Sequence, residues 1–145
     1  MTTYFFDTSA LVKRYHEEPG TKRVDEILDD EEHDVLISSL TVVESVSAFR
    51  RKYNRNEVSE PEMNQLISVF FREALADFVI VPMEESLLGF SFDLVLQNDL
   101  RTLDSLQLSA ALSLSERIEQ FGFVSADEEL VEVAAQRGLE TILPG

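Results

Sequence analysis

Short apolar runs alternate with longer amphipathic segments along this chain of 145 residues. Five of the runs have the length and composition of β-strands: residues 3–6, 34–38, 78–82, 121–125 and 139–143. Helical patterns lie between them, at 9–16, 21–30, 41–53, 63–78, 84–97, 102–118 and 127–137. Strands joined through helices favour right-handed crossovers and parallel pairing, with helices on both faces of the sheet. The sequence therefore predicts one α/β domain over residues 1–145, with a mostly parallel central sheet of about five strands flanked by helices.

Local signals mark some of the helix ends. Ser59 with Glu62 makes a capping box ahead of the segment 63–78, and Gly138 suits the position just after the last helix. In the helix at 41–53, apolar residues recur at helical spacing and predict its buried face: Val42, Val46, Phe49 and Tyr53.

The chain is strongly acidic, with 12 Lys and Arg against 28 Asp and Glu and a net charge of −16. Such a chain repels a polyanionic substrate unless metal ions or a local basic patch reverse the field. One basic patch exists, at residues 50–55 (RRKYNR). Its cations either complement the dipole at the end of their helix or contact a substrate, and the two roles are compatible.

The location of the protein is suggested by what the sequence lacks. Without cysteine there are no disulfides, so a reducing cytoplasm is the expected compartment. No segment approaches the roughly 20 apolar residues of a membrane-spanning helix, and the start MTTYFF does not have the pattern of a signal peptide. We therefore expect no contact with a membrane.

Three carboxylates stand alone in stretches with no other charged side chain. These stretches are unusual because 28% of the chain is charged: Asp7 in 1–12, Glu44 in 35–49 and Asp104 in 102–115. Asp7 directly follows the first predicted strand, Glu44 lies early in the helix after the second, and Asp127 begins the helix after the fourth. Ligands of parallel sheets bind beyond the carboxyl ends of the strands, so these acids are expected to share one active-site rim.

Each acid also has a purely structural interpretation. Asp7 can cap the helix that follows it, a contribution of about 1 kcal/mol. Asp104 can accept a hydrogen bond from Arg101 or favour the amino end of its own helix. Two further capping boxes are compatible with the sequence: Thr41 with Glu44, and Ser125 with Glu128. These separate roles do not explain why the acids converge on one end of the sheet. If each acid were only structural, that convergence would be a coincidence.

A cluster of carboxylates points to a particular chemistry. Neighbouring carboxylates repel one another, which raises their pKa values unless a cation neutralises them. Oxygen ligands suit Mg²⁺ or Mn²⁺, and such an ion can activate a bound water and stabilise charge on a phosphoryl oxygen. The ligands of a nitrogen–sulfur zinc site are lacking, since there is no Cys and the two histidines, His16 and His33, lie in charged segments.

Four segments together resemble a PIN domain, and more narrowly the single-domain VapC-type toxins of bacterial and archaeal toxin–antitoxin systems. The resemblance covers nearly the whole chain and follows the order of the family: DTSALVKRYHEEPGT (7–21), SSLTVVESVSAFRR (38–51), LRTLDSLQLSAAL (100–112) and FVSADEELVEVAAQRGLE (123–140). It implies a single PIN-like nuclease domain. The implied activity is that of a metal-dependent endoribonuclease, in which a metal-activated water attacks the phosphorus.

The resemblance also implies roles for individual residues. The acids Asp7, Glu44, Asp104 and Asp127 would form the catalytic site that holds Mg²⁺ or Mn²⁺. Two hydroxyl residues, Ser9 and Ser125, match positions beside the first and last acids and could orient ligands or water. Arg101 would either contact a substrate phosphate or pair with an acid, and we favour the pairing.

Partners follow from the same resemblance. Family members generally form homodimers, cut RNA, and are silenced by an antitoxin whose basic C-terminal segment covers the groove. The apolar segment 58–78, with Phe70 and Phe71, is either a core helix or a dimer surface, and a core helix is the simpler interpretation. Two alternative functions remain open. One is a non-catalytic binding module of the PIN fold, and the other is a DNA-directed nuclease, since discrimination between RNA and DNA depends on contacts to the 2′-hydroxyl.

Overall fold

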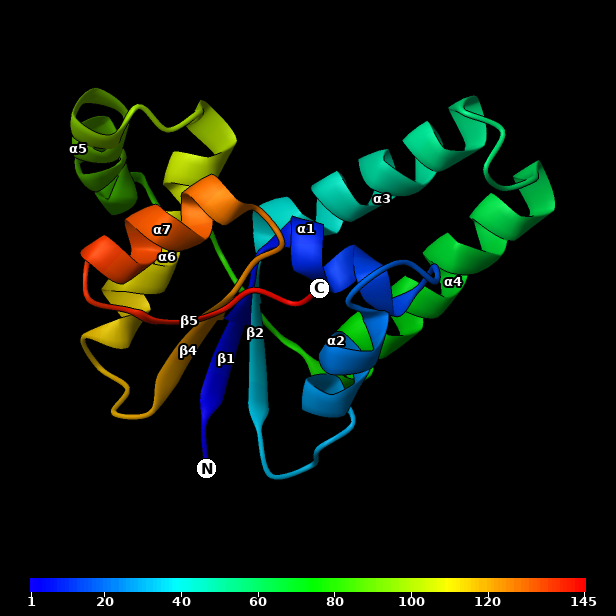
Figure 1. Cartoon of the computed structure of the whole chain (residues 1–145), viewed down its shortest axis with the longest axis horizontal. Coiled ribbons are helices and arrows are strands. Elements are labelled where there is room, and N and C mark those ends of the chain that lie inside the picture. Colours follow the sequence, from blue (N-terminus) through cyan, green and yellow to red (C-terminus); the bar gives the residue numbers. More distant parts are fainter.

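Five strands pair in parallel in a single sheet, with the order β3-β2-β1-β4-β5, in the computed structural model, which describes residues 1–145 (Figure 1). The strands are β1 (Thr3–Phe6), β2 (Asp34–Ser38), β3 (Val79–Val81), β4 (Phe121–Val124) and β5 (Glu140–Ile142). The parallel α/β sheet expected from the alternation of strand and helix patterns is confirmed, and β1 lies at its centre between β2 and β4.

Helices connect every pair of consecutive strands. They are α1 (Thr8–Leu11), η1 (Val12–Arg14), α2 (Thr21–Leu28), α3 (Ser39–Asn54), α4 (Glu60–Asp77), η2 (Glu85–Leu87), α5 (Leu88–Asn98), α6 (Thr102–Ser115) and α7 (Glu128–Gln136), where η marks a 3₁₀ helix. Two of the predicted helices are each divided into a 3₁₀ and an α portion: 9–16 and 84–97. None of the helices combines the length and the apolar character needed to cross a membrane.

The sheet separates two hydrophobic cores. Successive strand residues point to opposite faces, so Phe5 and Leu36 belong to one core while Phe6 and Ile37 belong to the other. Helices α5, α6 and α7 cover the first face, and α2, α3 and α4 cover the second (Figure 1). Because strands buried on both faces need apolar residues at every position, the continuous apolar runs of the sequence are explained by this two-layer cover.

Helices α3 and α4 form a long hairpin that projects from the sheet (Figure 1). The rings of Phe49 and Phe70 both meet Tyr15 edge-on, with centroids 6.0 and 5.5 Å from its ring. The predicted capping box of Ser59 and Glu62 is confirmed at the start of α4. Helix α4 buries Phe70 in the core, while Leu75 on its outer side is 77% exposed.

The buried face of α3 differs from the predicted one. Its fully buried residues are Thr41, Ser45 and Phe49, whereas Val42 and Val46 are only half-buried. The reason is that the first turn of α3 packs against the polar start of α1, so small hydroxyl side chains occupy the positions nearest the core.

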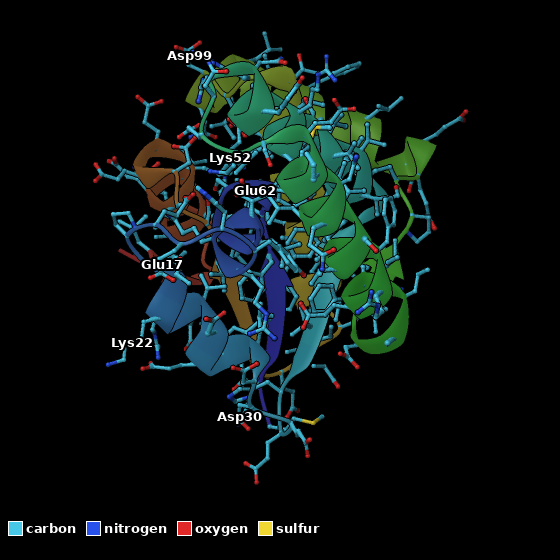
Figure 2. The ribbon with its side chains drawn as sticks, turned by 90° about the vertical axis from the view of Figure 1, so that its right-hand side faces the viewer. Glu17, Lys22, Asp30, Lys52, Glu62 and Asp99 are labelled. Carbon is cyan, nitrogen blue, oxygen red and sulfur yellow. The ribbon has the colours of Figure 1, made fainter.

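A charged network fastens the second layer together. The guanidinium of Arg14 contacts Glu73 on α4 through two nitrogens, at 2.8 and 3.3 Å, and also lies 3.0 Å from Asp25 and 2.8 Å from Asp29 of the α2 region. The hydroxyl of Tyr15 donates to Glu73 at 2.6 Å. Burial, followed by the hydrogen bond to Glu73, raises the pKa of Tyr15. Figure 2 views the molecule with α2 and α4 in front, where exposed side chains such as Lys22 project into solvent.

Replacing Arg14 with methionine should lower the free energy of unfolding by about 2–3 kcal/mol. The reason is that Glu73, whose side chain is only 19% exposed, would lose its bidentate cation. Arg23→Met is the matched control, because its pair with Glu26 is 3.6 Å long and half-exposed and should contribute less than about 0.5 kcal/mol. Urea unfolding of both variants tests this, and equal losses would contradict it.

Candidate active site

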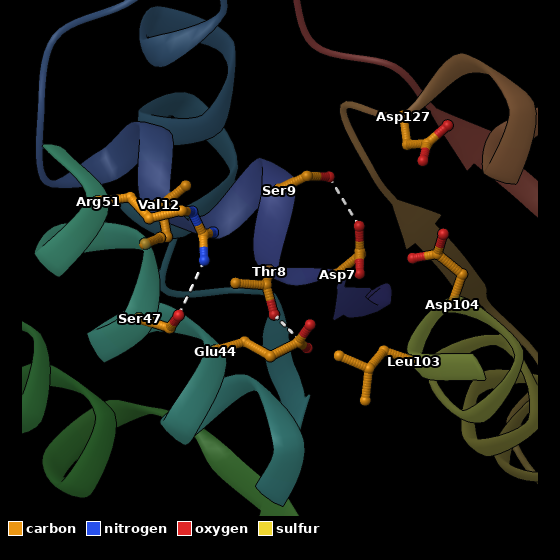
Figure 3. Close-up of a pocket in the computed structure, with 11 residues that line it drawn as sticks. Asp7, Thr8, Ser9, Val12, Glu44, Ser47, Arg51, Leu103, Asp104 and Asp127 are labelled. Atoms are coloured by element: carbon orange, nitrogen blue, oxygen red, sulfur yellow. Dashed lines mark hydrogen bonds between the residues drawn. The ribbon is translucent and has the colours of Figure 1, made fainter. Parts of the chain in front are cut away.

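The carboxyl edge of the sheet carries a cavity of about 260 Å³ that all four predicted acids line. They come from four different elements: Asp7 follows β1, Glu44 lies in the second turn of α3, Asp104 is in the first turn of α6, and Asp127 precedes α7. Figure 3 shows the carboxylates of Asp7, Glu44 and Asp104 facing a common space, with Asp127 above Asp104 at the start of α7. The structure thus brings together the residues that the sequence singled out.

Asp7 is the most deeply buried of the four, with 5% of its surface exposed. Its Oδ2 accepts hydrogen bonds from Ser9 Oγ at 2.7 Å and from Ser125 Oγ at 3.0 Å. Burial raises the pKa of Asp7, and the two hydroxyl donors partly oppose that shift. Asp7 occupies the N-cap position of α1, but its side chain makes no capping hydrogen bond, so capping does not account for it.

The two serines are themselves held by the backbone that leads into α7. Ser9 Oγ accepts from the amide of Ala126 at 3.0 Å, and Ser125 Oγ accepts from the amide of Asp127 at 3.1 Å. This chain of bonds links the start of α1 to the end of β4. The position of Asp7 is therefore determined from two strands at once.

Glu44 is half-buried and receives two side-chain donors on one oxygen. Thr8 Oγ1 donates to its Oε1 at 2.9 Å, and Gln107 Nε2 donates to the same atom at 3.0 Å. Burial raises the pKa of Glu44, the charge of Asp7 adds to this, and the two donors oppose it. The capping box of Thr41 with Glu44 is not formed, because Ser38 caps α3 and Glu44 lies too far along the helix to reach its start.

Gln107 is the residue that sequence reasoning missed. Its side chain is completely buried, and its Nε2 also donates to Thr41 Oγ1 at 2.7 Å while its Oε1 accepts from Ser38 Oγ at 2.7 Å. One amide therefore connects α6 to the start of α3 and to Glu44. A signal was available, since Gln107 is the only amide in the segment 102–115 and lies one turn after Asp104.

Asp104 carries the clearest electrostatic perturbation. Burial, together with the charges of Asp7, Asp127 and Glu44, raises its pKa to about 6, and Arg101 opposes the shift. Arg101 is exposed and makes no ion pair, so the favoured pairing with an acid is not found, because its side chain extends into solvent at the start of α6. It lines a neighbouring hollow of about 450 Å³ that shares Asp104 and Asp127 with the main cavity.

Asp127 also caps helix α7. Its Oδ1 accepts from the amides of Glu129 and Leu130, at 3.0 and 3.2 Å. The capping box of Ser125 with Glu128 is therefore wrong, because Asp127 occupies the N-cap position and Ser125 is turned towards Asp7. The other oxygen of Asp127 accepts no hydrogen bond and is free for a ligand.

The basic patch is divided between two surroundings. Lys52 is in an ion pair with Glu18 at 3.0 Å, which supports a structural role. Arg51 instead lines the acidic cavity and donates to Ser47 Oγ at 2.8 Å (Figure 3). The cavity therefore has one cationic side chain in its wall, which the sequence alone did not distinguish from its neighbours.

The donor set of the cavity fits a hard cation in its chemistry. All four carboxylates offer oxygen, no nitrogen or sulfur ligand is nearby, and none of the four is in an ion pair with Lys or Arg. No three of them are close enough together to form a metal-binding group in this arrangement. The cavity thus carries four carboxylates, with Arg51 as the one cationic side chain in its wall.

Comparison with known proteins gives one family match. The family model described as the PIN domain matches residues 4–136. No curated protein matches the chain at a significant level.

Several solved structures share the fold. VapBC2 from Rickettsia felis, bound to a DNA fragment from its promoter, is 17% identical with a TM-score of 0.65, over 99% of this chain and 100% of that one. The sarcin–ricin loop-cleaving toxin VapC20 from Mycobacterium tuberculosis is 10% identical with a TM-score of 0.69, over 97% and 99%. FitAcB from Neisseria gonorrhoeae is 16% identical with a TM-score of 0.66, over 97% of each chain. At these identities the likeness establishes the fold alone.

Replacing Asp104 with asparagine should stabilise the metal-free protein at pH 7. Its pKa is about 6 when folded against an ordinary 3.8, so between these values the folded protein keeps a proton that the unfolded chain releases. Stability therefore falls as pH rises through this window. With solvent screening discounted for a half-exposed group, the gain at pH 7 in EDTA should be about 1 kcal/mol.

The measurement is urea unfolding of both proteins at pH 7 and below pH 4, where the difference should vanish. Asp93→Asn, which makes the same change in charge at an exposed position on α5, serves as the control. If wild type and Asp104→Asn were equally stable at both pH values, the repulsion assigned to Asp104 would be refuted.

Replacing Gln107 with leucine should lower the free energy of unfolding by about 2–4 kcal/mol. The substitution leaves the buried hydroxyls of Ser38 and Thr41 and the carboxylate of Glu44 without their shared partner. Gln65→Leu on the exposed side of α4 is the matched control and should be nearly neutral. Chemical unfolding distinguishes the two, and a neutral Gln107→Leu would mean that water replaces the amide at no cost.

Proposed function

This chain belongs to the PIN domain family, and we propose that it is a metal-dependent endoribonuclease that acts as the toxin of a toxin–antitoxin pair. The observation that carries the proposal is the cavity at the carboxyl edge. Four carboxylates from four elements surround it, burial raises the pKa of three of them, and no basic side chain forms an ion pair with any of the four. Purely structural acids would be expected to have such partners.

A divalent ion would be held by Asp7, Glu44, Asp104 and Asp127. When bound, Mg²⁺ or Mn²⁺ lowers the pKa of water and stabilises negative charge on a phosphoryl oxygen, which is the chemistry that phosphodiester hydrolysis needs. The same charge would relieve the repulsion that raises the pKa of Asp104. It would also offset the repulsion between an anionic substrate and a protein of net charge −16.

The residues around the acids determine how those acids are presented. Ser9 and Ser125 both donate to Oδ2 of Asp7, which lines the cavity. Thr8 and Gln107 hold one oxygen of Glu44, which leaves Oε2 free. These donors fix one oxygen of each of the two carboxylates. Binding of an ion would then bring the four side chains closer together than they lie in this arrangement.

RNA is proposed as the substrate on the strength of the family resemblance. VapC20 from Mycobacterium tuberculosis, which is described as a sarcin–ricin loop-cleaving toxin, shares the fold over 97% of this chain. The geometry of the cavity suits a phosphodiester of either nucleic acid, because selection of RNA depends on contacts to the 2′-hydroxyl. A DNA-directed nuclease is therefore retained as an outcome of the experiment below.

We also propose a protein partner. The proteins of Rickettsia felis and Klebsiella pneumoniae that share the fold are toxin–antitoxin complexes. A cognate antitoxin with a basic C-terminal segment would be attracted to the acidic cavity of this chain. Homodimerisation is proposed on the family resemblance, and a cytoplasmic location stays a prediction from composition.

The test is cleavage of matched pools of single-stranded RNA and DNA by antitoxin-free protein in Mg²⁺, Mn²⁺ or EDTA. RNA should be cut only with metal, and Asp104→Asn should lower the rate at least about 100-fold because the substitution removes a carboxylate ligand. The control is Asp93→Asn, which has the same change in charge on the exposed surface of α5 and should keep its rate.

Each other outcome rejects part of the proposal. Cleavage of DNA alone would keep the mechanism and reject the substrate. Activity that persists in EDTA would reject the metal, and equal activity of Asp104→Asn and wild type would reject the site. A folded protein that cleaves neither pool would favour the non-catalytic binding module.

A further inference from the structure

One face of α3 continues the acidic cavity beyond the four carboxylates. Glu44, Ser47, Ala48 and Arg51 all line the cavity, and their spacing places them on one side of the helix. Arg55 follows Arg51 by four residues and therefore extends the same row at the end of α3. The helix thus forms a wall whose polarity changes from acidic near the sheet to basic at its far end.

Neither cation of this row is in an ion pair with an acid. Arg51 makes a single side-chain hydrogen bond, to the neutral hydroxyl of Ser47, and Arg55 makes no ion pair. The neighbouring cations behave differently, because Lys13 and Lys52 both contact Glu18 at about 3 Å. An arginine has five donors, and one that is not in an ion pair is suited to bind phosphate oxygens.

The charge of the whole molecule makes this row important. Only 12 of the 145 residues are Lys or Arg, and four of these lie within residues 50–55. Arg51 is the one of these four that lines the cavity. A polyanion that approaches a protein of net charge −16 is repelled over most of the surface. Phosphates that flank the reacting one therefore gain most where unpaired cations border the acidic cavity.

We propose that Arg51 and Arg55 form a phosphate-binding row that guides a single-stranded nucleic acid along α3 towards the four carboxylates. Along the helix, Glu44 and Arg55 are separated by about 16 Å, enough for a few nucleotides of single strand. The inference deepens the proposed nuclease function and rests on it for the identity of the reacting phosphate. The shared ligand chemistry is a phosphodiester backbone, of RNA or of DNA.

The experiment measures binding without cleavage. Fluorescein-labelled single-stranded RNA and DNA of equal length are titrated with the Asp104→Asn protein in Mg²⁺ at several salt concentrations. Arg51→Gln/Arg55→Gln is compared with Arg72→Gln/Arg117→Gln, which removes two exposed arginines elsewhere and so matches the change in net charge.

The Arg51→Gln/Arg55→Gln pair should raise Kd at least about tenfold at low salt. It should also reduce the slope of log K against log salt by about 1.4, the value for two lost contacts to a single strand. The Arg72→Gln/Arg117→Gln pair should change neither quantity. Equal effects of the two pairs, no effect of either, or no binding by the Asp104→Asn parent would overturn the proposal. An effect on DNA alone would assign the row to DNA.

A second experiment separates this proposal from the nuclease proposal. It measures cleavage by the same arginine variants made in the protein that keeps Asp104. If the two arginines bind flanking phosphates, Arg51→Gln/Arg55→Gln should raise KM at least about tenfold and should lower kcat by a smaller factor. A protein that binds through the row but cuts nothing would reject the nuclease and keep the row. A protein that cuts, with KM unchanged by the substitutions, would keep the nuclease and reject the row.

Discussion

The central position of β1 is the constraint on which the site depends. Strand β1 is paired on both sides, with β2 and with β4, and its residues alternate between the two cores. The chain consequently leaves β1 in the middle of the carboxyl edge, and Asp7 is the first residue beyond it. Helix α3 reaches this point from one layer and α6 from the other, so that a change in strand pairing would separate Asp7 from both Glu44 and Asp104.

Burying the carboxylates of the cavity lowers the stability of the folded protein, and other interactions of the fold offset this loss. A carboxylate buried without a cation is unfavourable, and here the compensation comes from neutral donors: Ser9 and Ser125 for Asp7, Thr8 and Gln107 for Glu44. These donors are available because the two cores hold their helices in place. The cavity is therefore maintained by the fold, which is typical of a functional site rather than of a stabilising one.

Isolation within uncharged stretches is enough to single out three of the four acids, because apolar neighbours in sequence indicate burial. The same local reasoning fails where two side chains compete for one role. Capping boxes at Thr41 and at Ser125 fit the sequence, yet Ser38 and Asp127 make the caps that form. Which residue caps a helix depends on where the preceding strand ends, and a difference of two or three residues lies within the uncertainty of a pattern.

By itself, the sequence determined the alternation of strand and helix, the parallel sheet and the end of the sheet at which the acids gather. Those features follow from neighbours a few residues apart. Only the tertiary structure decided that Gln107 would reach Glu44, 63 residues away, and that Arg51 rather than Lys52 would face the cavity. Such contacts depend on how two helical layers are placed against one sheet, and hydrophobic periodicity specifies which face of a helix is buried but not what that face meets.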